Sequence, residues 1–387
     1  MSVDINALLK RSVKMSASDL HIKAGNHPAV RVDGKIVPLQ DEKRLMPEDT
    51  RELATIIMND YQKEQFAKVN DIDVGYSIPG LGRFRCNCFV QRGSVSIVFR
   101  IVSMEILDIE DLMLPVVLKK IAMEPRGLIL VTGTTGSGKS TALASMIDYI
   151  NINKTENIIT IEDPIEFLYR DKKSIISQRE IGHDTESFSK ALRAALRQDP
   201  DVILVGEMRD FETIQTALVA AETGHLVLST LHTSDAVETI NRIISVFPPY
   251  QHKQVRIQLA SVLRAIISMR LVPRADEKGR VPAVEVLVAT TTIKSCIEDS
   301  DKTKQIPDFI AEGFSQYGMQ TFDQSLLSLY QRGIITYEDA LNRATNRDDF
   351  ALKVKGVMST KDSWDYSAAS KTNEKQRKGP DIARFSG

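Results

Sequence analysis

Eight residues near the middle of the chain, at positions 133–140, read GTTGSGKS and are compatible with very few folds. They match the pattern G-x-x-x-x-G-K-[S/T] and lie between a short apolar run, residues 128–132, and a segment with apolar residues at helical spacing. Glycines let several backbone N–H groups point at one anion, and the start of a helix adds unpaired N–H groups with positive partial charge. The segment therefore predicts a phosphate-binding loop between a buried strand and a helix.

A loop of this kind binds a nucleoside triphosphate together with Mg²⁺. Lys139 is expected to reach the β- and γ-phosphates, and the hydroxyl of Ser140 to help hold the metal ion. We predict ATP and Mg²⁺ as cofactors, with these nucleotide-binding residues: Gly133, Thr134, Thr135, Gly136, Ser137, Gly138, Lys139, Ser140 and Thr141.

Two acidic segments follow other apolar runs, and buried parallel strands read as such runs. The segment DVILVGE ends in Glu207, whose carboxylate suits the metal's water shell or the orientation of an attacking water. The segment IEDPIE carries Glu162, Asp163 and Glu166, three carboxylates that repel one another unless a cation or hydrogen-bond donors lie among them. From the residues alone, any of the three is a candidate general base towards water. Glu207, Glu162 and Asp163 join Ser140 as candidate metal ligands.

Two histidines, His225 and His232, flank a further apolar run at residues 226–229. Two histidines seven residues apart in a strand, without a cysteine partner, do not converge on zinc. We interpret them instead as candidates for sensing the γ-phosphate or for contacts between subunits.

The hydrophobic pattern changes along the chain, which indicates more than one domain. Residues 1–101 mix helical and alternating segments and predict a small α+β domain, and residues 102–117 predict a linker. Residues 118–358 predict an α/β domain with a parallel sheet, because amphipathic helices alternate with short apolar runs. These runs are residues 128–132, 158–161, 202–205 and 226–229. Residues 359–387 are polar and predict a flexible tail.

Composition narrows the possible partners. The chain has 50 basic and 51 acidic residues, so its net charge of −1 gives no overall attraction to nucleic acid or to an anionic membrane. No stretch approaches 18 consecutive apolar residues, so we predict no membrane-spanning segment, and the first residues do not resemble a signal peptide. The three cysteines, Cys86, Cys88 and Cys296, lack the paired spacing of a zinc site and predict reduced thiols.

Taken together, the four segments at 133–140, 162–166, 201–207 and 223–232 resemble those of the secretion ATPase superfamily, which powers type II and type IV secretion and pilus motors. Further matches are similar to its type IV pilus retraction (twitching motility) branch, PilT and the related PilU. These matches are ASDLH at 17–21, RFR at 83–85, QRE at 178–180 and GMQT at 318–321. The resemblance covers about residues 3–350.

The resemblance implies a PAS-like N-terminal domain joined to a RecA-like P-loop ATPase domain, with ATP bound between a subunit's two domains. It also implies roles for individual residues. Glu166 matches the position usually assigned as catalytic base, Glu207 the Walker B acid, and His232 the histidine near the γ-phosphate. Lys139 completes the predicted catalytic set, and arginines of the N-terminal domain reach the phosphates in such proteins. The candidates here are Arg83, Arg85 and Arg100.

The implied function is a cytoplasmic, homohexameric, ATP-hydrolysing motor that powers pilus retraction. It would act on an inner-membrane platform protein, with or without a paralogous ATPase in the ring. One alternative is a pilus-extension or type II secretion ATPase, but those relatives usually carry a longer N-terminal region and a tetracysteine zinc element, which are not found here. A nucleic-acid translocase is an alternative from another class, and a regulatory subunit that binds ATP without hydrolysing it is a third. The match to the family's Ala-Ile-Arg segment, at residues 292–297, is weak, and whether the chain follows the PilT or the PilU branch stays open.

Overall fold

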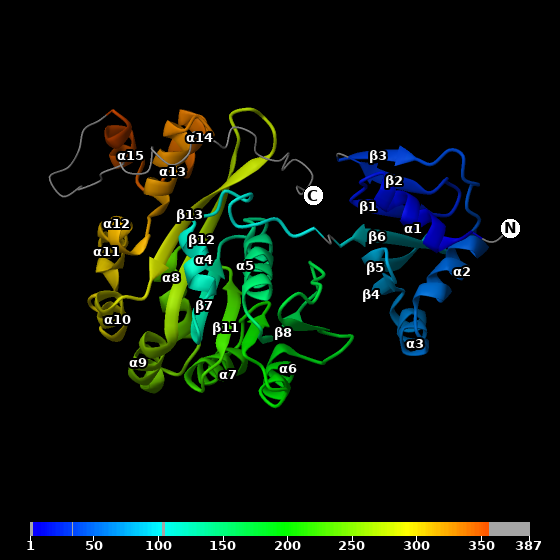
Figure 1. Ribbon diagram of the computed structural model, residues 1–387. Helices are drawn as coiled ribbons and strands as arrows, with labels where there is room; N and C mark the ends of the chain where they lie inside the picture. Colours follow the sequence, from blue (N-terminus) through cyan, green and yellow to red (C-terminus); the bar gives the residue numbers. More distant parts are fainter. Residues whose placement is uncertain (1–2, 33, 103–104, 356–387) are drawn as a thin grey trace. The chain divides into compact units, whose positions relative to one another are not determined.

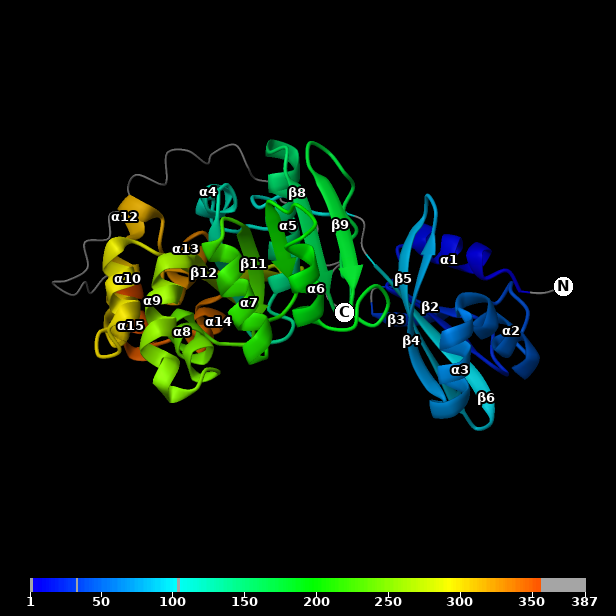
Figure 2. The ribbon, with the colours of Figure 1, turned by 90° about the horizontal axis from the view of Figure 1, so that it is seen from below.

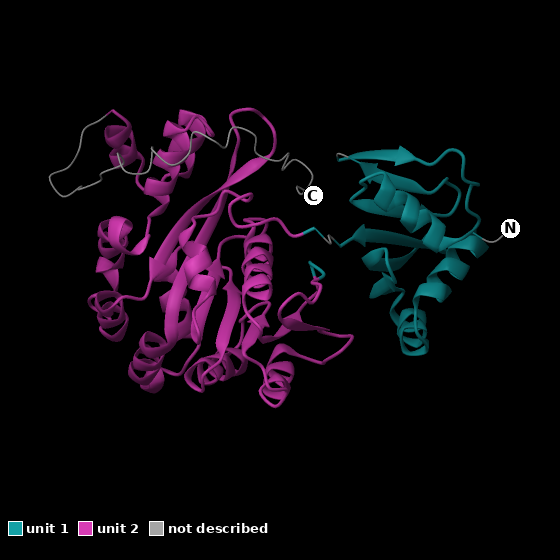
Figure 3. Ribbon diagram, in the orientation of Figure 1, with its two compact units in different colours: residues 1–105, 166–168, 384–387 teal, residues 106–165, 169–383 magenta. Residues whose placement is uncertain are grey.

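The computed structural model describes residues 3–32, 34–102 and 105–355 of the chain. The described residues form two compact units, one made of those up to 105 with 166–168, the other of 106–165 and those from 169 onward (Figure 3). The predicted tail, residues 359–387, lies outside the described residues. The boundaries at 101 and 117 stay predictions.

The N-terminal unit is a six-stranded antiparallel sheet in the order β3-β2-β1-β6-β5-β4, with three helices (Figure 1). The strands are β1 Asp19–Lys23, β2 Ala29–Val32, β3 Lys35–Pro38, β4 Asp71–Ile78, β5 Gly82–Gln91 and β6 Ser94–Ile101. The helices are α1 Ile5–Lys14, α2 Pro47–Ile57 and α3 Asp60–Val69. This arrangement confirms the predicted α+β class of the unit.

Alternation explains which face of this sheet is covered. Phe84, Cys86 and Cys88 alternate along β5 and are fully buried, whereas Arg83 and Arg85 point to the other face. Neither α3 nor β4 is predicted by the sequence pattern. The signal for α3 was present, because Asn59 and Gln62 form a capping box at its start.

The second unit is built on a seven-stranded sheet in the order β13-β12-β7-β11-β10-β8-β9. Six of its strands run parallel, and β13 pairs antiparallel with β12. The strands are β7 Gly127–Thr132, β8 Asn157–Glu162, β9 Ile175–Glu180, β10 Val202–Val205, β11 Leu226–Leu231, β12 Leu263–Pro273 and β13 Arg280–Val288. The four predicted apolar runs are confirmed as β7, β8, β10 and β11.

Helices cover both faces of this sheet (Figure 2). One core cluster joins α4 and α5 to one face, and another joins α6 to α11 to the opposite face. The helices are α4 Val117–Ala122, α5 Lys139–Asn153, α6 Phe188–Ala195, α7 Phe211–Glu222, α8 Ala236–Ser245, α9 His252–Val262, α10 Thr291–Glu298, α11 Ile306–Glu312, α12 Phe314–Tyr317, α13 Phe322–Gln331, α14 Tyr337–Arg343 and α15 Arg347–Val354, with short 3₁₀ turns at Pro249–Gln251 and Thr303–Gln305. The predicted α/β class is confirmed.

Three strands, β9, β12 and β13, were not predicted. At the sheet edge, β9 alternates between exposed and half-buried positions at its start, and only its last residue, Glu180, is buried, so it forms no apolar run. The apolar pattern of β12 is interrupted by Arg264 and Arg270. Within the described parts of the chain, no helix has the length and apolar character needed to cross a membrane.

A carboxylate is buried between β13 and α8. The Glu285 side chain, on β13, accepts a hydrogen bond from the backbone N–H of Ala236 at 2.9 Å. Burial, reinforced by the nearby Asp235, raises the pKa of Glu285 to about 7, although the Ala236 N–H and the Arg270 guanidinium act in the opposite direction. The acid therefore keeps its proton in the folded chain at pH values where the unfolded chain has lost it.

This shift predicts how stability changes with pH. Because the folded pKa is raised, stability falls as pH rises from 4.5 to about 7 and falls no further above that. At about 1.4 kcal/mol per pKa unit, the loss is about 3 kcal/mol. The neutral variant Glu285→Gln should not show this loss of stability between pH 4.5 and 7. The melting temperature of the wild type minus that of the variant should therefore be lower at pH 8 than at pH 5.5. An equal difference at both pH values would contradict the assignment.

Candidate active site

The parallel strands bring the predicted polar segments to one edge of the sheet. The phosphate loop begins directly after β7, His232 follows β11, Gly206 and Glu207 follow β10, and Glu162 ends β8. In the sheet, β11 lies between β7 and β10, and β8 lies beside β10. The carboxyl ends of parallel strands lie at the same edge, so four of the sequence segments meet there.

The phosphate loop requires glycine for steric reasons. Gly133 has a φ of 144°, and a Cβ placed there would lie 2.5 Å from the Met269 carbonyl oxygen and 2.5 Å from Ser137 Oγ. Gly138 has a φ of 93° at the N-terminus of α5. Thr134, Thr135 and Gly136 at the loop tip are exposed. The backbone of this loop thus has the conformation that directs N–H groups at an anion.

Two groups in the loop fit a phosphate. The Lys139 ammonium is buried and donates hydrogen bonds to the carbonyl oxygens of Gly133 at 2.9 Å and Thr134 at 3.0 Å. The Ser137 hydroxyl oxygen is buried without a hydrogen-bond partner. A buried hydroxyl without a partner is costly, and a phosphate oxygen would satisfy it. Ser140 and Thr141, half-buried in the first turn of α5, complete the predicted set.

Glu207 lies within a small charged cluster. Its carboxylate binds the Arg209 guanidinium and lies 3.4 Å from His232 Nε2. The backbone holds this arrangement, since Thr230 Oγ1 donates to the Gly206 carbonyl at 2.6 Å. Gly206 packs closely against the neighbouring strand: a Cβ placed on it would lie only 3.2 Å from the Ile161 carbonyl oxygen. Arg209 was not singled out in the sequence, because only the fold shows it beside Glu207.

The acidic segment after β8 is held by the neighbouring strand β9. Glu162 is buried and accepts hydrogen bonds from Thr160 Oγ1 at 2.6 Å and Gln178 Nε2 at 3.1 Å. Glu180, also buried, accepts the backbone N–H of Ile165 at 3.0 Å. Glu162 is therefore bound to the protein's own donors, which weakens the case for it as a metal ligand. The QRE motif at 178–180 fixes the segment that leads to Glu166.

The other predicted residues have contrasting environments. Asp163 and Glu166 are exposed. His225 lies at the start of β11, at the sheet edge opposite to the phosphate loop, and its Nδ1 is 2.9 Å from the Ala220 carbonyl. This position does not fit the γ-phosphate-sensing interpretation of His225. Within the described ranges, no group of three or more His, Cys, Asp or Glu side chains is arranged to hold a metal ion.

The three predicted arginines share one face of the N-terminal sheet. Arg83 and Arg85 are two residues apart on β5, and Arg85 pairs directly with Arg100 on β6. Arg100 forms an ion pair with Asp19 at 3.2 Å, and Arg85 lies 3.8 Å from a carboxylate, that of Asp73. Cross-strand pairing thus places cationic groups side by side, as a polyanion site needs.

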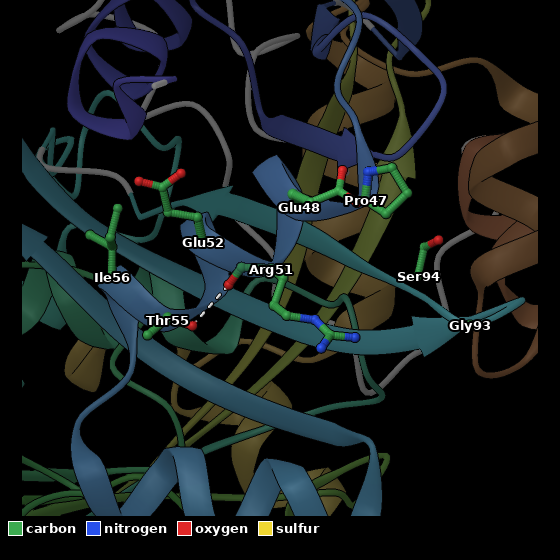
Figure 4. Close-up of a pocket in the computed structure, with 8 residues that line it drawn as sticks. All are labelled: Pro47, Glu48, Arg51, Glu52, Thr55, Ile56, Gly93 and Ser94. Atoms are coloured by element: carbon green, nitrogen blue, oxygen red, sulfur yellow. Dashed lines mark hydrogen bonds between the residues drawn. The ribbon is translucent and has the colours of Figure 1, made fainter. Parts of the chain in front are cut away.

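A separate surface groove in this unit lies between α2 and the turn that joins β5 to β6 (Figure 4). It is lined by Pro47, Glu48, Arg51, Glu52, Thr55, Ile56, Gly93 and Ser94. Its charges are mixed, and it contains none of the predicted site residues. The groove therefore does not compete with the phosphate loop as a nucleotide site.

Comparison with known proteins decides the family. The sequence profile described as "Type II/IV secretion system protein" matches residues 1–324. The chain belongs to this family. Among its members, the type IV pilus retraction ATPase PilT of Pseudomonas aeruginosa is 45% identical over 351 residues, covering 90% of this chain and 100% of PilT. The type IV pilus ATPase PilU of the same organism is 43% identical, covering 91% and 92%. The predicted resemblance is confirmed.

A solved family structure, that of the pilus retraction motor PilT with bound ADP, also matches the fold. The TM-score is 0.83 at 48% identity, covering 90% of this chain and 99% of that one. The match supports the predicted fold, a RecA-like ATPase domain preceded by a smaller N-terminal domain. The two relatives differ by too little in identity to choose between the PilT and PilU branches.

The loop geometry makes a direct prediction. Gly133→Ala would place a methyl group 2.5 Å from the Met269 carbonyl, at a φ that disfavours any side chain. We expect a cost of about 1–3 kcal/mol in stability and loss of nucleotide affinity. Thr135→Ala, at the exposed tip of the same loop, is the matched control and should melt as the wild type does. Thermal melting and titration with a fluorescent ADP analogue measure both effects. A Gly133→Ala variant that binds nucleotide normally would exclude this loop as the site.

Proposed function

We propose that this chain is an ATP-hydrolysing motor that powers retraction of type IV pili. The observation that carries the proposal is the sheet edge itself, where a phosphate loop, a carboxylate and a histidine follow neighbouring strands. Its similarity to PilT and PilU along nine-tenths of the chain supports the pilus function.

The residues at this edge divide the work of ATP hydrolysis. Lys139 would exchange its two carbonyl partners for the β- and γ-phosphates. Mg²⁺ would neutralise phosphate charge, held by Ser140 and, through its water shell, by Glu207. His232, whose Nε2 lies 3.4 Å from the Glu207 carboxylate, would sense the γ-phosphate. Glu166 is the proposed general base, because it is exposed and its segment is fixed by Glu180, whereas Glu162 is occupied.

Arg83, Arg85 and Arg100 are the proposed phosphate-binding arginines of the N-terminal domain. Arginine suits this role since it stays charged and binds phosphate through two parallel hydrogen bonds. The assembly proposed is a homohexamer, alone or mixed with a paralogous ATPase, acting on a platform protein of the inner membrane. A motor that consumes ATP works where ATP is made, so we propose that it lies in the cytoplasm and reaches the membrane through that partner.

Two substitutions test the motor. Lys139→Ala should weaken ATP binding about 10- to 100-fold, because a charge-assisted hydrogen bond contributes about 1.5–3 kcal/mol. Glu207→Ala should bind ATP nearly normally but lose turnover by about 100-fold or more. ATPase assays and nucleotide titrations separate the two. In cells, either variant should leave surface pili in place without twitching. Loss of pili would indicate an extension ATPase, and full motility would refute the motor.

The arginine assignment has its own test. Arg85→Ala and Arg100→Ala should each lower the turnover number by about tenfold or more, as removal of a phosphate-contacting arginine does. Arg92→Ala is the matched control, because Arg92 is exposed on the turn between the same two strands. Steady-state ATPase rates of the three purified variants decide the matter. Equal rates in all three would remove these arginines from the site.

A further inference from the structure

A buried row of polar side chains crosses three neighbouring strands beside the phosphate loop. Ser268 on β12 pairs in register with Thr132 on β7 and with Glu285 on β13. Thr132 Oγ1 donates to Ser268 Oγ at 3.0 Å, and the Ser268 side chain next to Glu285 acts to lower the pKa of that carboxyl by hydrogen bonding. All three residues are buried. The row is thus a continuous polar path across the three strands.

The two ends of this path meet the two sides of the candidate active site. Thr132 is the last residue before Gly133, where the phosphate loop begins. At the other end, Glu285 accepts the N–H of Ala236, the first residue of α8, at 2.9 Å. Ala236 follows His232 by four residues. The path therefore joins the base of the phosphate loop to the helix that anchors the His232 loop.

Further contacts fix the loop that carries His232 to the first turn of α8. Asp235 caps the helix by accepting the Glu238 N–H at 2.8 Å. Thr233, the residue after His232, is buried, and its hydroxyl lies 2.6 Å from the hydroxyl of Thr239 in α8. The short loop has little freedom apart from its helix, so the place of the first turn of α8 sets the place of His232.

A carboxylate is an expensive group for this position. A buried acid without a full ionic partner costs more than a well-packed apolar pair would. Packing β13 against α8 would not need a carboxylate. Binding the free N–H at the start of a helix needs a strong acceptor, and a carboxylate provides one.

We propose that Glu285 is a positioning residue for ATP hydrolysis, which holds the first turn of α8, and with it His232, at a fixed place relative to the phosphate loop. This inference rests on the proposed ATPase function. A displacement of about 1 Å at a catalytic group costs on the order of 100-fold in rate, so loss of this acceptor should reduce turnover more than nucleotide binding.

The test compares variants of the full chain. Glu285→Ala should lower kcat about tenfold or more, while KM for ATP and the affinity for a fluorescent ADP analogue change less than about threefold. Glu285→Gln keeps the acceptor for the Ala236 N–H, and its kcat should stay within about threefold of the wild type. Ser268→Ala cuts the path at its centre and should lower kcat at least about threefold, together with a fall in melting temperature like that of any buried hydroxyl that is removed.

A matched control separates positioning from general stability. Thr303→Val removes the buried hydroxyl that donates to the Cys296 carbonyl at 3.0 Å, outside the path. It should lower the melting temperature but not kcat. Wild-type kcat in Glu285→Ala, or equally low kcat in Glu285→Gln and Glu285→Ala, would overturn the proposal. If Glu285→Ala does not fold, an unchanged kcat in Ser268→Ala would overturn it. A wild-type chain without ATPase activity would overturn the proposed function as well.

Discussion

The hydrogen-bond ladder of the parallel sheet is the constraint on which the site depends. Its register aligns Ile161, Val205 and Ser229 across three strands and Leu231 with Thr132 across the next pair. A one-residue slip in any of these strands would turn its side chains to the opposite face and withdraw one polar group from the edge. The strands themselves are fully buried, so hydrophobic packing on both faces fixes the register that the chemistry needs.

In this sheet, the polar groups of the site have environments in which binding an anion is favourable. The Lys139 ammonium is held by two carbonyl oxygens, and Ser137 has a buried hydroxyl without a partner. A bound phosphate relieves both conditions at once, because it neutralises the ammonium charge and accepts a hydrogen bond from the Ser137 hydroxyl. Glu207 is balanced differently, by Arg209 and His232. Because the Arg209 guanidinium is exposed, it can leave Glu207 when a metal-bound nucleotide arrives.

The sequence predicts those functional residues that directly follow a strong local pattern, such as an apolar run. The phosphate loop, Glu207 and His232 each follow an apolar run, and such runs are readable when both faces of a strand are covered. The sequence does not predict groups brought together by the order of strands. Ser268 and Glu285 lie on β12 and β13, where charged residues interrupt the apolar pattern that would predict a strand. Neither residue is near Thr132 in the chain. Likewise β9 was missed because its exposed face breaks the run, although Glu180 on it fixes the segment before Glu166.

The same strand β12 also explains how chemistry at the sheet edge reaches distant helices. Arg270 lies two residues beyond Ser268, so both side chains project to the same side of the strand. Its guanidinium lies 3.7 Å from the ring centre of Phe322 at the start of α13 and donates to the Arg343 carbonyl at the end of α14, at 2.8 Å. A motor must convert small changes around a phosphate into movement of remote elements, and packed elements linked by hydrogen bonds transmit such changes. Through Ser268 and Arg270, one strand contacts both the base of the phosphate loop and the C-terminal helices.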